Sequence, residues 1–246
     1  MKNKKKILGI VGIRSGSSSL KNKNIRILGN KPLVGWILSS AKKSKYINRL
    51  VVSTDSKKYA KISRKYGAET PYLRPKHLAT KFSDEIGFIK HVINHLRKKE
   101  NYNPDIVVRL LATVPFQKVT DIDKIIKLVL KNKYDSAVII SKAKQHPYKA
   151  LKIIGNTKKY LVSFRTNKGI DVGRKNNRQL NEKFENIYFR SNVIACKTKV
   201  IRKYNSLCSS KTGYFIIPQT VDIDDEVDFK FANFLLKDSS KKNKNF

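Results

Sequence analysis

A run of small and basic residues follows the first apolar stretch of the sequence. The residues in this run that could bind a ligand or take part in a reaction are Arg14, Ser15, Gly16, Ser17, Lys23 and Asn24. Small residues let a backbone approach a phosphate closely and turn its amides toward the anion, while Arg14 and Lys23 would neutralise the charge. The run lacks the Gly-Lys-Ser/Thr of a P-loop and the three spaced glycines of a dinucleotide motif. It predicts an anion-binding loop, and a flexible serine-rich loop with basic flanks is an equally good interpretation.

A second candidate site lies far along the sequence, where Asp222 and Asp224 flank Ile223. On a strand, residues two apart point to the same face, and two carboxylates there suit Mg²⁺ or Mn²⁺ shared with a triphosphate. One of the carboxylates could also accept a proton from an attacking hydroxyl. The alternative is an acidic strand end that caps the next helix, a role that fits Asp225 or Glu226 better than Asp222.

Short β-rich runs alternate with amphipathic stretches over the first 140 residues, a pattern typical of βαβ units around a mainly parallel sheet. We expect strands at 7–13, 49–53, 106–111, 136–140, 191–196, 214–217 and 220–223. We expect helices beginning near Pro32, over 55–66 with Asp55 as the cap, over 84–99 and 121–132, from Lys197, and over 226–236.

The chain of 246 residues is predicted to form a single domain over 1–236. From about 142 to 188, short extended pieces broken by glycines indicate an inserted segment. The lysine-rich end, 237–246, is predicted to be a frayed basic tail.

Charge is the unusual feature of the composition, because 54 Lys and Arg face 18 Asp and Glu, a formal net charge of +36. Such a charge raises the possibility of a polyanionic partner. Lysines are spread over the whole sequence rather than gathered in a stripe with aromatic residues, which favours a solvated shell over a nucleic-acid site.

Two cysteines in a chain of this length indicate reduced thiols and a cytoplasmic protein. No apolar run is long enough to span a bilayer, so no membrane segment is expected. The basic start with a short apolar run leads straight into Arg14, which favours a strand over a signal peptide.

One ordered series of motifs runs through almost the whole chain and resembles the acylneuraminate cytidylyltransferase family, which includes CMP-sialic acid synthetases and their legionaminic, pseudaminic and Kdo relatives. The motifs are Arg14-Ser15-Gly16-Ser17, Lys23-Asn24-Ile25-Arg26, Gly29-Asn30-Lys31-Pro32-Leu33, Val51-Val52-Ser53-Thr54-Asp55, Tyr66-Gly67-Ala68-Glu69, Leu73-Arg74-Pro75, Leu78-Ala79-Thr80, Ala112-Thr113-Val114-Pro115, Asn177-Arg178-Gln179, Tyr188 to Asn192 and Val221 to Phe229.

The resemblance implies a three-layer, Rossmann-like nucleotide-diphospho-sugar transferase fold and a homodimer built partly from the inserted segment. It also implies magnesium-dependent transfer of CMP from CTP to an acidic 2-keto sugar of eight or nine carbons. By the same resemblance, Arg14, Lys23 and Arg178 are expected in catalysis and Asp222 and Asp224 at the metal. The expected substrate-binding residues are Ser15, Gly16, Ser17, Asn24, Arg74 and Ser83.

The sequence departs from the family pattern at several of these motifs. Serines replace a glycine-lysine run at 18–19, and Leu111 replaces a glutamine. Lys81 and Phe82 stand where acidic or small residues are usual, Glu85 stands where a small hydroxyl residue is common, and Val193 replaces a glycine. These departures bear on the sugar identity and on the strength of the activity. Two alternatives therefore remain open: a nucleotidyltransferase for another sugar acid such as Kdo or for another nucleotide, and an inactive paralogue whose basic surface binds nucleic acid.

Overall fold

In a computed structural model of the chain, the described residues are 5–17, 19–143, 150–154, 160–163 and 187–242. The chain divides into two compact units. The first comprises Met1–Ile139, Ser191–Phe215 and Thr220–Phe246, and the second Ile140–Arg190 and Ile216–Gln219. Most of the predicted insertion, 142–188, lies outside the described residues, so its role in dimerisation stays a prediction. In the second unit, β7 (Leu151–Ile154) and β8 (Tyr160–Ser163) form an antiparallel pair.

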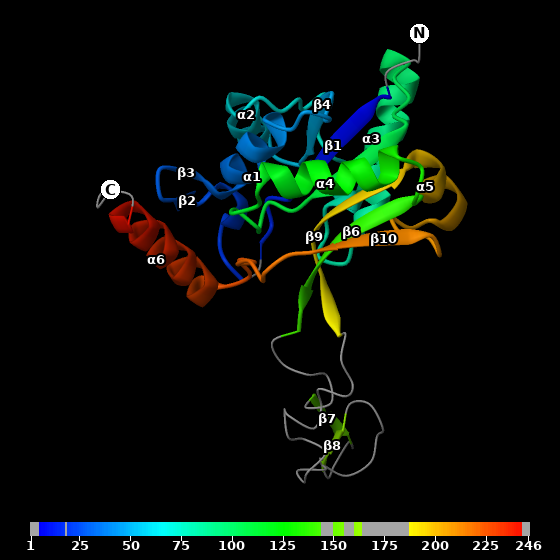
Figure 1. Cartoon of the computed structure of the whole chain (residues 1–246). Helices are drawn as coiled ribbons and strands as arrows, with labels where there is room; N and C mark the ends of the chain where they lie inside the picture. Colours follow the sequence, from blue (N-terminus) through cyan, green and yellow to red (C-terminus); the bar gives the residue numbers. More distant parts are fainter. Residues whose placement is uncertain (1–4, 18, 144–149, 155–159, 164–186, 243–246) are drawn as a thin grey trace. The chain divides into compact units, whose positions relative to one another are not determined.

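The central sheet has six strands in the order β10-β6-β9-β5-β1-β4 (Figure 1). The strands are β1 (Ile7–Gly12), β4 (Arg49–Ser53), β5 (Ile106–Leu110), β6 (Ser136–Lys142), β9 (Tyr188–Lys197) and β10 (Thr212–Ile216). Strand β1 is parallel to β4 and to β5, whereas β9 is antiparallel to β5. The unbroken apolar run of β1 is almost completely buried, as expected for a parallel strand covered on both faces.

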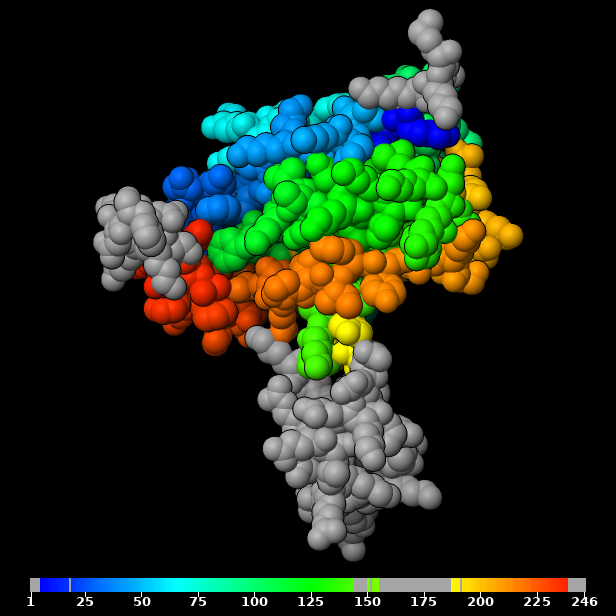
Figure 2. Space-filling view, in the orientation of Figure 1, coloured from blue at the N-terminus to red at the C-terminus, as the bar shows by residue number. Residues whose placement is uncertain are grey.

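Helices cover the two faces of this sheet and complete a three-layer α/β fold (Figure 1). They are α1 (Leu33–Lys42), α2 (Lys57–Lys65), α3 (Glu85–Glu100), α4 (Val119–Leu130), α5 (Thr198–Tyr204) and α6 (Glu226–Lys242). Helix α3 buries Phe88, Ile89 and Val92 in one cluster with Leu8 and Val107 of the sheet. Helices α1 and α4 contact each other, and their surfaces adjoin in the space-filling view (Figure 2). The predicted fold class is thereby confirmed.

Shorter elements connect these layers. Residues Lys23–Ile25 and Lys76–Leu78 form 3-10 helices, and β2 (Ile27–Leu28) pairs with β3 (Lys31–Pro32). Among the described residues, no helix is long and apolar enough to cross a membrane.

Three local expectations were wrong. Ser56 caps α2 by accepting a hydrogen bond from the Tyr59 amide at 3.3 Å, and Asp55 contacts Ser15 instead. Residues 220–223 form no strand, although the Ile223 amide donates to the Thr113 carbonyl at 2.9 Å. Helix α6 continues past 236 to Lys242, so part of the predicted frayed tail is helical.

The strand order places β1 where the chain changes direction across the sheet. From β1 the chain passes through α1 to β4 on one side, and then through α2 and α3 to β5 on the other side. In open α/β sheets, ligands bind beyond the carboxyl ends of the strands at such a switch point. The loops after β1 and β5 therefore define the place to look for a site.

Candidate functional site

A cavity of about 420 Å³ lies at the carboxyl ends of β1 and β5. Its walls come from the loops after β1 and β5, from the segment between α2 and α3, from the start of α3 and from the segment before α6. The lining residues are Gly12, Arg14, Ser17, Ser19, Lys23, Asn24, Arg74, Leu78, Thr80, Lys81, Ser83, Asp84, Glu85, Phe88, Leu111, Thr113 and Asp224. The cavity thus gathers most of the predicted site residues from segments far apart in the sequence.

Four predicted site residues are placed differently or not described. Arg178 lies outside the described residues. Ser15, Gly16 and Asp222 are not among the residues that line the cavity. The Ser15 amide and hydroxyl both donate to the Asp55 carboxylate, at 2.9 and 2.6 Å, and the Ser17 amide donates to the Ser15 carbonyl at 3.3 Å. These amides are used within the chain rather than turned toward an anion.

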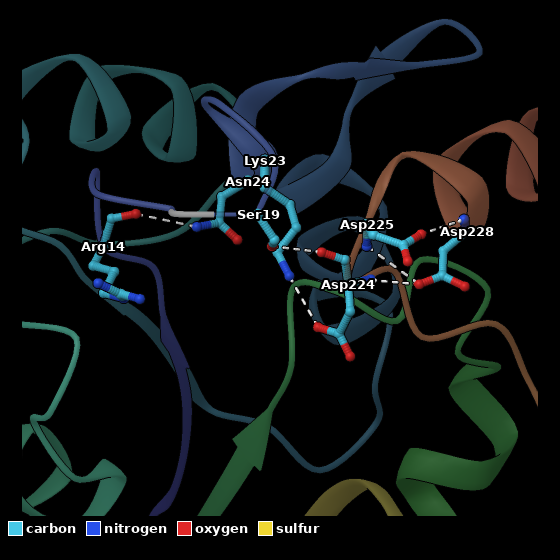
Figure 3. A network of polar contacts seen from close by, with 7 residues as sticks. All are labelled: Arg14, Ser19, Lys23, Asn24, Asp224, Asp225 and Asp228. Atoms are coloured by element: carbon cyan, nitrogen blue, oxygen red, sulfur yellow. Dashed lines mark hydrogen bonds and ion pairs between the residues drawn. The ribbon is translucent and has the colours of Figure 1, made fainter.

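The loop after β1 is held by one short 3-10 helix that buries both Lys23 and Asn24. The Asn24 side-chain amide donates to the Arg14 carbonyl at 3.2 Å, which fixes the backbone where the loop leaves the strand (Figure 3). The Arg14 guanidinium forms no hydrogen bond or ion pair with the described residues. Because a guanidinium fork matches phosphate geometry, Arg14 is available to hold a phosphate at the mouth of β1.

Lys23 faces the segment before α6. Its Nζ lies 3.0 Å from Asp224 Oδ1, and its side chain keeps 11% of its exposure while that of Asp224 keeps 78% (Figure 3). The backbone of Asp224 is fixed separately, since its amide donates to Asp228 at 2.9 Å and its carbonyl accepts from the Ser19 hydroxyl at 2.6 Å. The Asp224 carboxylate therefore projects into the cavity from a fixed backbone.

Asp225 and Asp228 perform the capping at the start of α6. The Asp228 amide donates to Asp225 Oδ1 at 3.0 Å, and the Asp225 amide donates back to Asp228 Oδ2 at 3.3 Å (Figure 3). This reciprocal pattern is a capping box. It separates two roles within one acidic run, because the cap does not use the side chain of Asp222 or Asp224.

The carboxylates of Asp222 and Asp224 lie close enough to influence each other. Asp222 is exposed as a whole residue, but its carboxylate is partly desolvated, and this desolvation raises the pKa of Asp222. A hydrogen bond from Thr113 opposes the shift, and repulsion from Asp224 adds to it. Among the described residues, no group of three or more His, Cys, Asp or Glu side chains could enclose a metal. Magnesium usually needs one or two carboxylates plus substrate phosphates rather than a full protein cage, so this donor set fits it.

Arg74 forms a rigid wall of the cavity. Its Nε donates to the Ser53 hydroxyl at 3.0 Å, Nη2 to the Ser53 carbonyl at 2.5 Å and Nη1 to the Leu78 carbonyl at 3.4 Å. The guanidinium also packs 4.3 Å from the centre of the Phe88 ring, and burial lowers the pKa of Arg74 to about 10. A Cβ at Gly12 would come within 2.3 Å of that ring, so the glycine lets Phe88 cross the end of β1.

Ser83 organises the loop that leads into α3. Its hydroxyl donates to the His77 carbonyl at 2.9 Å and accepts from the Thr80 amide at 3.0 Å. Asp84 then caps α3 by accepting from the Gly87 amide at 2.7 Å. These contacts fix the loop wall next to Glu85, whose Oε1 lies 3.0 Å from Nε of the buried Arg109.

The sequence profile of a protein family described as cytidylyltransferase matches residues 8–238. The chain belongs to the cytidylyltransferase family. The matched range includes every residue that lines the cavity, so the cavity lies within the cytidylyltransferase region.

Individual relatives match over nearly the whole chain. Post-translational flagellin modification protein B of Campylobacter coli is 29% identical over 98% of this chain and 99% of its own. CMP-N,N'-diacetyllegionaminic acid synthase of Campylobacter jejuni is 27% identical over 94% of each chain. A solved structure of CMP:2-keto-3-deoxy-manno-octonic acid synthetase complexed with CTP superposes with a TM-score of 0.67 at 15% identity, covering 95% of this chain and 99% of that one. This last likeness shows a shared fold.

The pairing of Glu85 with Arg109 has no motif in the sequence that predicts it. The available signals were an arginine inside the apolar run Ile106–Leu110 and an acidic residue at the predicted start of a helix. Neither signal named the partner, because the two residues meet only when α3 packs on β5.

Proposed function

We propose that this cytidylyltransferase transfers CMP from CTP to an acidic 2-keto sugar of eight or nine carbons and releases pyrophosphate. The observation that carries the proposal is the convergence of Arg14, Lys23 and Asp224 on one cavity in a chain of this family. The name of the Campylobacter jejuni relative, a CMP-N,N'-diacetyllegionaminic acid synthase, supports an acceptor of the sialic acid kind.

The triphosphate would lie against the loop after β1. Arg14 would hold its oxygens through two parallel hydrogen bonds, which a lysine cannot reproduce. Lys23 would turn from Asp224 toward the phosphates, since its ammonium is a point charge on a flexible stem. Asn24 would keep this loop in place through the Arg14 carbonyl.

Asp224, assisted by Asp222, would hold Mg²⁺ or Mn²⁺ together with the triphosphate oxygens. When bound, the cation supplies neutralisation of the charge that develops on those oxygens. The anomeric hydroxyl of the sugar forms a bond to the α-phosphorus, and the bond from this phosphorus to the bridging oxygen of pyrophosphate breaks. The leaving oxygen takes the electron pair, and one of the two aspartates accepts the hydroxyl proton.

The deciding experiment measures pyrophosphate release by the full chain with CTP and a panel of 2-keto sugar acids. We expect release with at least one sialic-type acid, dependent on magnesium or manganese and abolished by EDTA. Undiminished release in EDTA would overturn the metal assignment. Absence of release with every acid would overturn the transfer itself.

Two further expectations concern the whole enzyme. We infer a homodimer built partly from residues 142–188, and sedimentation of the full chain at twice the monomer mass would support it. We also infer a cytoplasmic location, where CTP is available. Both rest on the family resemblance and the composition.

A further inference from the structure

An arginine lies in the apolar layer beneath the cavity. Arg109 of β5 is 3% exposed and shares the α3-covered face of that strand with Val107, since alternate residues point the same way. Its Nη1 donates to the Asn192 carbonyl at 3.0 Å, and its Nε lies 3.0 Å from Glu85 Oε1. A charge buried in this way needs a partner, so Arg109 fixes the position of the Glu85 carboxylate.

Glu85 connects this buried charge with the cavity. It is the first residue of α3, it lines the cavity, and its side chain keeps 35% of its exposure. An ionised carboxylate accepts hydrogen bonds and cannot donate them. The cavity therefore contains a hydrogen-bond acceptor, the Glu85 carboxylate, at the start of α3. Its position is fixed by the buried Arg109.

The surroundings of Glu85 indicate which part of a substrate it meets. Leu78, Phe88 and Leu111 line the same cavity as Glu85. Phe88 is one helical turn further along α3, Leu78 lies close to Gly87 near the start of α3, and Leu111 directly follows β5. A triphosphate would be repelled by the carboxylate and belongs near Arg14 and Lys23. A sugar acid would leave hydroxyls unpaired against these apolar side chains. A flat, partly apolar heterocycle with one amino donor fits best.

We propose that Glu85, held in place by Arg109, selects the nucleobase by accepting a hydrogen bond from the 4-amino group of cytosine. The inference rests on the proposed function, because it assumes that a pyrimidine nucleotide occupies this cavity. Uracil carries a carbonyl oxygen at the same ring position, which the carboxylate repels. Arg109 is a positioning residue, since it contacts Glu85 and not the base.

The test measures the affinities of the full chain for CTP and for UTP with magnesium by calorimetry, without an acceptor sugar. We expect the parent to prefer CTP, and Glu85→Gln to lose this preference by about 10- to 100-fold, because a hydrogen bond to a charged group is lost and the new amide can donate to uracil. The ratio of the two affinities within one variant does not depend on the folded fraction. It is therefore insensitive to any loss of stability.

Two variants complete the design. Arg109→Lys keeps a buried cation but loses the planar guanidinium that positions the Glu85 carboxylate, so it should lower the preference for CTP over UTP. If Arg109 had a purely structural role, the variant would bind both nucleotides less tightly by the same factor. Glu100→Gln is the matched control, because Glu100 pairs with Arg49 at 2.6 Å at the other end of α3. Its CTP preference should equal that of the parent.

The outcomes separate this inference from the proposed function. The inference is overturned if Glu85→Gln keeps the CTP to UTP affinity ratio of the parent within about twofold. This includes the case in which the variant binds both nucleotides less tightly by the same factor. A parent that prefers CTP and loses this preference in Glu85→Gln, but releases no pyrophosphate with any sugar acid, supports the inference and overturns the transfer. A parent that binds neither nucleotide overturns both.

Discussion

Two ion pairs each place one carboxylate in the lining of the cavity, and they differ in how firmly they are held. In each, a cation with little exposure meets a more exposed carboxylate. The Lys23 and Asp224 side chains keep 11% and 78% of their exposure, and those of Arg109 and Glu85 keep 3% and 35%. The shared arrangement presents a carboxylate to a ligand at both places.

The difference lies in the cation and in the element that carries it. Lys23 is in the short 3-10 helix of the loop after β1 and offers a single flexible ammonium. Arg109 is on the central strand β5, where its Nη1 donates to the Asn192 carbonyl and its Nε lies 3.0 Å from Glu85 Oε1. The first pair can exchange partners when phosphates and a cation arrive. The second pair cannot do so without moving a guanidinium that is 3% exposed and bonded to the Asn192 carbonyl. A pair that can exchange partners is suited to contact the reacting phosphates. A pair that stays in place is suited to recognise a fixed group of the substrate.

The largest expected effect is on stability, at the fixed pair. Glu85→Ala removes the carboxylate 3.0 Å from the buried Arg109 and should lower the free energy of unfolding by about 3–5 kcal/mol. Asp224→Ala should cost much less, because the flexible stem of Lys23 lets the ammonium reach water in the cavity. Urea unfolding of both variants checks this comparison. Glu85→Ala combined with Arg109→Leu should recover most of the loss, and equal losses for the two single variants would contradict the distinction.

The next effect is on turnover, at the exchangeable pair. Asp224→Asn keeps the shape of the side chain but removes the charge that would hold a metal and its triphosphate. We expect kcat/KM for CTP to fall about 100-fold, equivalent to about 2.7 kcal/mol of transition-state stabilisation. Pyrophosphate release with and without added magnesium measures it. A variant within about twofold of the parent would show that Asp224 does not hold the metal.

Sequence patterns predicted well those elements in which burial and periodicity agree. The continuous apolar run of β1 and the helix ended by Gly67 are examples, because their local composition leaves few alternatives. The strand predicted at 220–223 was wrong for a physical reason. Its alternation of apolar and acidic residues is that of a strand, and Ile223 is indeed fully buried, but no strand in the described part of the chain pairs with it.

Site residues that belong to a local sequence motif could be predicted from the sequence. Those whose role depends on a contact with a distant residue could not. The spacing of small and basic residues drew attention to Arg14, Lys23 and Asn24, all of which line the cavity. Asp55 was expected to cap a helix, but its carboxylate instead accepts from Ser15, forty residues earlier in the chain. Such long-range partners depend on the packed sheet and leave no local pattern in the sequence.

The smallest expected effect separates the two functions of the acidic run. Asp225 caps α6 by accepting from the Asp228 amide, whereas the neighbouring Asp224 turns its carboxylate toward Lys23. Asp225→Ala should therefore cost about 1 kcal/mol of stability, the usual price of a lost helix cap, and leave the turnover of the folded protein within about twofold of the parent. Asp224→Asn should show the opposite pattern, with a small change in stability and a large loss of turnover. Thermal melts of both variants, paired with pyrophosphate release normalised to the folded fraction, make the comparison. If Asp225→Ala lost turnover as severely as Asp224→Asn, the cap and the cavity would not be separable. The bonds of the Asp224 backbone to Asp228 and Ser19 would then not suffice to place its carboxylate without the Asp225 side chain.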